Sequence, residues 1–119
     1  MIVLCEDSVI LSVKLKNALV KKAELRNMDI TVTLKNISIN GDKRGCSGFI
    51  VNNENGSIVY VNTEKSVYGG ISPYLYRYAN STSDYTGYHN RYAKTLDELV
   101  NSIIELLKQT PLEAKDFRF

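Results

Sequence analysis

The sequence has no tryptophan, only two cysteines and two prolines, a single histidine and almost balanced charge. Fifteen basic against thirteen acidic residues give a net charge of +2, which argues against an acidic nucleic-acid mimic and against nucleic-acid binding by bulk charge alone. One histidine and two distant cysteines lack the paired spacing of a zinc site. No other catalytic motif appears, so we expect neither an enzyme nor a bound metal or cofactor.

Long apolar runs are missing as well. The longest is far shorter than the roughly 20 residues that a membrane-spanning helix needs, so we expect no membrane partner. The apolar residues 1–5 lack a basic leader and run directly into Glu6 and Asp7, which argues against a signal peptide. Cysteines in such a chain are usually reduced, so we predict that Cys5 and Cys46 are not joined and that the protein works in a bacterial cytoplasm.

The size and composition of the chain indicate one globular domain. It has 119 residues, of which 44% are apolar and 24% charged. We assign residues 1–110 to this domain and residues 111–119 to a C-terminal tail, whose Phe117 and Phe119 could dock on the body or on a partner.

A capping pattern marks the start of a helix near the C-terminus. Thr95 can accept a hydrogen bond from the amide of Glu98, as in a capping box, and Thr110-Pro111 ends the helix because the residue before proline avoids the helical region. Apolar residues at three- and four-residue steps share one face, which we expect to cover a sheet: Leu96, Leu99, Val100, Ile103 and Leu107.

The middle of the chain predicts β-strands. Residues 30–34 alternate apolar and polar side chains, and a bulge at Lys35–Asn36 would keep Ile37 and Ile39 on the same face. A further strand is expected from Tyr74 to Tyr78.

Between these strands, residues 48–62 predict a hairpin that turns at Asn55-Gly56. A three-residue loop with Gly56 in the left-handed region pairs Val51 with Val59 and Phe49 with Val61, which gathers four apolar side chains on one face.

The N-terminal third has two competing patterns. Residues 9–16 alternate as a strand would, whereas Lys14–Asn27 has helical spacing. We favour a helix that begins at Asp7 or Ser8, either of which is a suitable N-cap. The predicted fold is therefore α+β, in the order α-β-β-β-β-α: an antiparallel sheet of about four strands with the N- and C-terminal helices on one face.

Seven of the eight tyrosines fall within residues 68–92, which also contain the only histidine. Tyr and Arg dominate interface hot spots because they bring a large contact area at modest ordering cost. Three of the tyrosines alternate along the predicted strand and could instead pack beneath a helix, but the later ones lie in a polar, loop-like segment. We predict a partner-binding face made of Tyr74, Tyr76, Arg77, Tyr78, Tyr85, Tyr88, His89, Asn90, Arg91 and Tyr92.

Nucleic-acid binding is the main alternative. The order of helices and strands, with basic loops, resembles that of the double-stranded RNA-binding domain, but the last helix opens with residues 95–98, TLDE, where that family has a basic KKxAK-type cluster. The tyrosines could instead stack on single-stranded RNA or DNA bases, with Arg77 and Arg91 alongside. A small enzyme built around Cys46 and His89 is the third interpretation.

The overall character of the chain gives a more specific expectation. Its size, its lack of catalytic motifs and its richness in Asn, Lys, Ile and Tyr resemble those of small accessory proteins of phages and mobile elements in AT-rich bacteria. Many of these block host defence nucleases, as anti-CRISPR proteins do. This resemblance implies a protein partner, such as a nuclease or a ribonucleoprotein complex.

Overall fold

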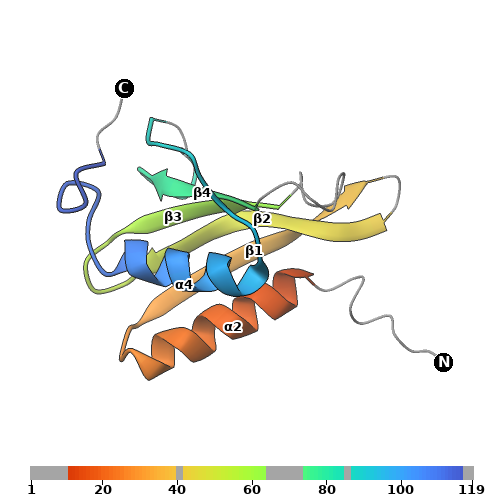
Figure 1. Cartoon of the computed structure of the whole chain (residues 1–119), viewed down its shortest axis with the longest axis horizontal. Coiled ribbons are helices and arrows are strands. Elements are labelled where there is room, and N and C mark those ends of the chain that lie inside the picture. Colours follow the sequence, from red (N-terminus) through yellow and green to blue (C-terminus); the bar gives the residue numbers. More distant parts are fainter. Residues whose placement is uncertain (1–10, 40–41, 64–73, 85–86, 117–119) are drawn as a thin grey trace.

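The computed structural model describes residues 11–39, 42–63, 74–84 and 87–116 (Figure 1). Their strands form one antiparallel sheet in the order β1-β2-β3-β4-β5, and both helices cover the same face of it. This confirms the predicted α+β fold, with the short β5 as one strand more than expected. The elements are α2 Leu11–Leu25, β1 Ile30–Ile39, β2 Asp42–Asn52, β3 Ile58–Asn62, β4 Tyr74–Ala79, β5 Arg91–Ala93 and α4 Leu96–Leu107.

In the N-terminal third, the described residues form a helix, α2, and not the alternative strand. The chain is helical from Leu11, and Leu15, Leu19 and Ala23 are buried at four-residue steps, so helical spacing prevails over alternation. The expected start at Asp7 or Ser8 lies outside the described residues. The helix ends where Asn27 takes a left-handed conformation, with φ of 56°.

Helix α4 begins as its capping pattern predicts. The Thr95 hydroxyl accepts a hydrogen bond of 3.1 Å from the amide of Glu98. The apolar face of α4 then packs on the sheet, beside α2. Fully or almost fully buried side chains from both layers form the core, among them Leu99, Ile103, Leu107, Ile50, Val59, Val61 and Tyr78.

Side chains from the hairpin between β2 and β3 bind the end of α4. The final carbonyl groups of a helix have no partner within the helix and need one elsewhere. The side-chain amides of Asn52 and Asn55 donate to the carbonyl of Leu107, at 2.7 and 3.1 Å, and the Ser57 hydroxyl donates to that of Gln109 at 2.7 Å. The hairpin between β2 and β3 is therefore joined to the end of α4.

The predicted register of this hairpin is wrong by one residue. Val51 pairs with Ile58 and Phe49 with Tyr60, although Gly56 does adopt the expected left-handed conformation, with φ of +80°. Both faces of the hairpin carry apolar residues, so hydrophobic patterning alone could not fix the pairing. The observed register turns Asn52 and Ser57 toward the end of α4, where they bind the carbonyl groups of Leu107 and Gln109.

Strand β1 differs from its prediction in one detail. The irregularity in its pairing with β2 falls between Ile37 and Ile39 and not at Lys35–Asn36. Asn36 keeps its place in the ladder, and its side-chain carbonyl accepts a hydrogen bond of 2.5 Å from Ser12 of α2. Opposite β1, a Cβ atom on Gly48 would lie 2.0 Å from the carbonyl oxygen of Thr33, so the two strands approach too closely for any other residue at this position.

Candidate recognition surface

The structure divides the predicted tyrosine face between the two sides of the sheet. Tyr76 and Tyr78 point toward the helices and are buried, with 9% and 0% of their surface exposed. Tyr74 is half-buried and packs against the same core. Strand alternation thus turns Tyr76 and Tyr78 toward α4 and away from the exposed surface, so neither is part of the surface considered below.

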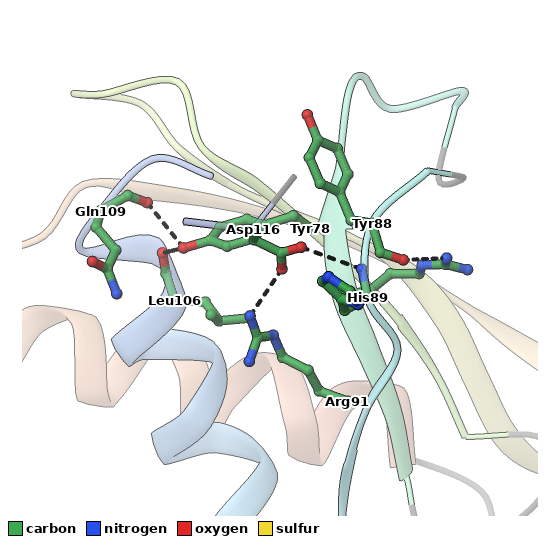
Figure 2. A network of polar contacts seen from close by, with 8 residues as sticks. Tyr78, Tyr88, His89, Arg91, Leu106, Gln109 and Asp116 are labelled. Atoms are coloured by element: carbon green, nitrogen blue, oxygen red, sulfur yellow. Dashed lines mark hydrogen bonds and ion pairs between the residues drawn. The ribbon is translucent and has the colours of Figure 1, made fainter. Parts of the chain in front are cut away.

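The hydroxyl of Tyr78 has a structural task. It donates a hydrogen bond of 2.6 Å to the carbonyl of Leu106 and lies 3.3 Å from that of Gln109 (Figure 2). The pKa of Tyr78 is raised from 10.0 to about 12, mainly by burial; Arg91 lowers it, and the Asp116 and Glu113 carboxylates raise it. Tyr78 is thus a neutral donor at the end of α4.

A partly buried ion pair holds the segment before β5. The Asp116 carboxylate is almost fully buried and lies 2.8 Å from an Nη atom of Arg91 (Figure 2). Its other oxygen accepts a hydrogen bond of 3.3 Å from the backbone amide of His89. Residues 111–116, which we expected to belong to a tail, return to the body at this point, and Phe117 and Phe119 lie outside the described residues.

Arg77 holds the same segment from the other side of the sheet. Its guanidinium group donates a hydrogen bond of 2.6 Å to the carbonyl of Tyr88. The ring of Tyr88 meets that of Tyr78 edge-on, with centroids 6.2 Å apart, and its hydroxyl donates to the side chain of Asn80 at 2.8 Å. Residues 88–91 are therefore fixed by contacts on both sides.

Three of the predicted residues remain exposed on or beside this fixed segment. His89 and Asn90 are exposed, and Tyr92 on β5 has 47% of its surface exposed. Tyr92 lies opposite Leu75 of β4 and points away from the helices. Tyr85 lies outside the described residues.

The face of the sheet that points away from both helices carries further aromatic and basic side chains. Tyr60 on β3 lies between Phe49 of β2 and Arg77 of β4 in the ladder, and the rings of Phe49 and Tyr60 are 5.4 Å apart. We call this face, with Phe49, Tyr60, Leu75, Arg77 and Tyr92, the outer sheet face. A cleft of about 230 Å³ opens on it, lined by Lys35, Ser47, Gly48, Phe49, Tyr60, Thr82 and Ser83.

Sequence reasoning missed Phe49 and Tyr60 because it placed the hairpin in the wrong register. In the observed register, Phe49 and Val51 share the outer face with Ile58 and Tyr60. The alternation of residues 48–62 contained this information, but it allowed either set of side chains to point inward.

Cys46 is unsuited to the role of nucleophile considered above. Its side chain is fully buried and forms no disulfide. Burial raises the pKa of the Cys46 thiol from 9.0 to about 11, and the Thr63 hydroxyl lowers it only in part. The thiol is therefore protonated at neutral pH. Among the described residues, no group of three His, Cys, Asp or Glu side chains could hold a metal ion.

Comparisons with protein-family models, curated proteins and solved structures returned no match for this chain. Within the described residues, no helix is long and apolar enough to cross a membrane.

Proposed function

We propose that this protein is a non-enzymatic binding module that grips a protein partner. Its contact surface comprises His89 and Asn90, together with the outer sheet face next to them. The observation that carries the proposal is the way this surface is held. Exposed His89 and Asn90 stand on a segment fixed by Asp116 and Arg77, and exposed Tyr92 follows directly on β5.

Rigid anchors of this kind favour binding. A side chain or loop that is already fixed loses little conformational entropy on association, so more of the contact energy appears as affinity. Tyr and Arg are the residues most often found at interface hot spots, and Tyr92 and Arg77 belong to the same face. Both helices lie on the opposite side of the sheet, so they leave this face open to a partner (Figure 1).

The finer form of the proposal concerns the partner. The size of the chain and its Asn-, Lys-, Ile- and Tyr-rich composition support a phage or mobile-element protein that inhibits host defence machinery, in the manner of anti-CRISPR proteins. The partner is then a nuclease or a ribonucleoprotein complex, and the protein acts by occupying its surface.

Quantitative affinity capture tests the proposal. The tagged wild-type protein, a variant with Asn90→Ala and Tyr92→Ala, and the control Asn101→Ala, which changes an exposed residue of α4, are incubated with bacterial lysate treated with nuclease. We expect one protein to be enriched by the wild type and the control but lost with the double variant. Equal recovery by all three, with unchanged melting temperatures, would overturn the proposed surface. Inhibition of the purified partner's cleavage activity then tests the finer form.

Single-stranded nucleic acid is the second candidate ligand, and the paired rings of Phe49 and Tyr60 favour it. Aromatic side chains on an open sheet are suited to stacking with unpaired bases, and Lys35 lines the adjoining cleft. Titration of mixed-sequence RNA and DNA oligonucleotides at several salt concentrations separates the two candidates. Binding that weakens steeply with salt, and that Phe49→Ala greatly reduces, would favour nucleic acid.

A further inference from the structure

Strand β1 forms one edge of the sheet. Within the described residues it pairs only with β2, so its other side has no strand partner. It is ten residues long, whereas the strand at the opposite edge, β5, has three. A long, regular edge strand presents backbone N–H and C=O groups to any strand that can pair with it.

The backbone contacts show which residues face this open side. The carbonyl of Asp29 accepts a hydrogen bond of 2.9 Å from the amide of Asn53, at the end of β2. In an antiparallel ladder, successive residues direct their backbone groups to opposite sides. Ile30, Val32 and Leu34 therefore direct theirs toward the open edge.

The sequence of this edge is nearly symmetric about Val32. Residues 29–35 read DITVTLK, with an aspartate and a lysine at equal distances from the centre and a threonine on each side of it. We propose that β1 pairs with β1 of a second copy of this chain, antiparallel, with Val32 opposite Val32 of the partner subunit.

This register matches charge and side-chain type along the strand. Lys35 lies opposite Asp29 of the partner subunit, and Thr31 opposite Thr33 of the partner subunit, each of them exposed in the single chain. Opposite charges and Thr–Thr pairs on directly facing positions stabilise antiparallel strands. A shift by two residues in either direction would place Lys35 away from the carboxylate, so the charge pairs select this register.

Helix α2 contributes a second self-complementary strip. Ala18 and Leu25 line a groove shared with α4, and Leu15 and Leu19 are buried beneath the sheet. The side of the helix away from α4 therefore carries Lys16, Val20 and Glu24, which follow one another at four-residue steps and are all exposed.

Antiparallel pairing of two β1 strands with Val32 opposite Val32 of the partner subunit places a two-fold axis at Val32. The exposed strip on α2 lies at the same level along the strand as this axis. Helix α2 runs opposite to β1 (Figure 1), and Ser12 is bonded to Asn36. Eight residues of helix span about the same length as four residues of strand, so Val20 comes to about the level of Val32 along β1. An axis near Val32 then brings Val20 against Val20 of the partner subunit and Lys16 toward Glu24 of the partner subunit. The dimer would contain one continuous sheet, with the outer sheet faces of both copies on the same side.

Sedimentation of the full chain over a range of concentrations, combined with charge exchange, tests the dimer. We expect a monomer–dimer equilibrium in the wild type and a dimer at least about tenfold weaker in Asp29→Lys, which places like charges opposite each other at both symmetric positions. The double variant Asp29→Lys with Lys35→Asp exchanges the two charges and should restore the affinity. A wild type that stays monomeric at every concentration overturns the proposal, as does a dimer whose affinity is the same in the wild type and in both variants.

Disulfide trapping tests the register in a Cys5→Ser background. Thr31 and Thr33 of the partner subunit form a pair without backbone hydrogen bonds, where the Cα atoms are about 4.5 Å apart and within disulfide range. An equimolar mixture of Thr31→Cys and Thr33→Cys proteins should therefore form a covalent dimer under mild oxidation, and each variant alone much less. Equal trapping of either variant alone, or no trapping in the mixture, contradicts this pairing.

Discussion

Tyr78 and Tyr92 come from the same tyrosine-rich stretch, but the fold places them in opposite surroundings. Tyr78 points toward the helices, is fully buried and binds the end of α4, whereas Tyr92 lies on the outer sheet face with 47% of its surface exposed. The difference arises from strand alternation and not from the residue type. A cluster of one residue type along a sequence therefore marks a region, and only the direction of each side chain tells which members are available to a partner.

The helix side of the sheet should show the largest loss of stability when it is changed. Ile103 of α4 is fully buried in the core, so Ile103→Ala should lower the free energy of unfolding by roughly 2–5 kcal/mol. Urea denaturation measures this change. A loss below about 0.5 kcal/mol, the size typical of surface substitutions, would show that α4 does not pack on the sheet through this residue.

Arg91 was predicted to contact a partner, whereas in the structure its guanidinium group pairs with Asp116. Arg91→Ala removes the cation beside the buried Asp116 carboxylate and should lower the free energy of unfolding by about 3 kcal/mol. Urea denaturation again gives the value. The double variant Arg91→Ala with Asp116→Asn is the control, because it removes the buried charge as well and should recover part of the loss. Full stability of Arg91→Ala alone would mean that Arg91 belongs with Tyr92 as an exposed anchor.

Tyr78→Phe tests the buried tyrosine directly. It leaves the ring in place but deprives the Leu106 carbonyl of its donor, which should lower the free energy of unfolding at pH 7 by roughly 1–3 kcal/mol. Wild-type stability in this variant would show that the hydroxyl contributes nothing to closing the end of α4.

The free energy of unfolding at alkaline pH provides a second test of Tyr78. Its pKa is raised from 10.0 to about 12, so the folded state holds the proton more tightly than the unfolded chain does. The stability that the Tyr78 proton contributes to the folded state is fully present below pH 10 and is lost as the pH rises toward 12. The stability difference between wild type and Tyr78→Phe should therefore shrink over that range. Cys46, with its pKa raised from 9.0 to about 11, adds a loss from pH 9 that both proteins share.

Tyr92→Ala should have the smallest effect on folding. The side chain is exposed, so its removal should change the melting temperature and the free energy of unfolding very little, within about 0.5 kcal/mol. Affinity for the captured partner should instead fall by about 2 kcal/mol, as at a typical hot spot. Calorimetric melting and a binding titration on the same preparation make the comparison, and a variant that only melts earlier would place Tyr92 with Tyr78.

Local sequence signals were sufficient to predict secondary-structure elements such as α4 and β1. Thr95 and the apolar spacing after it specify α4, and the alternation from Ile30 specifies β1, because capping and side-chain periodicity act over a few residues. The three-residue β5 was missed because it is too short to show any periodicity. Its place in the sheet comes from pairing with β4.

The recognition surface was harder to predict because it depends on contacts between distant residues. Nothing near Arg91 in the sequence shows that its charge is matched by Asp116, 25 residues later. The outer face of the hairpin depends on a register set by Asn52 binding to Leu107, 55 residues away. His89, Asn90 and Tyr92 were correctly placed on the surface because their segment has loop composition, whereas whether they bind a partner stays a prediction.

The bonds between the β2–β3 hairpin and the last turn of α4 have a consequence for the order of folding. They join residues 52 to 55 positions apart, so a large loop must close before any of them can form. A nascent α4 can extend from its Thr95 cap, but its final carbonyl groups stay bound to water until the hairpin arrives. We expect the amides of the first turns of α4 to gain protection from hydrogen exchange early in refolding. The end of the helix and the Asn52–Ser57 turn should become protected together, in one late step.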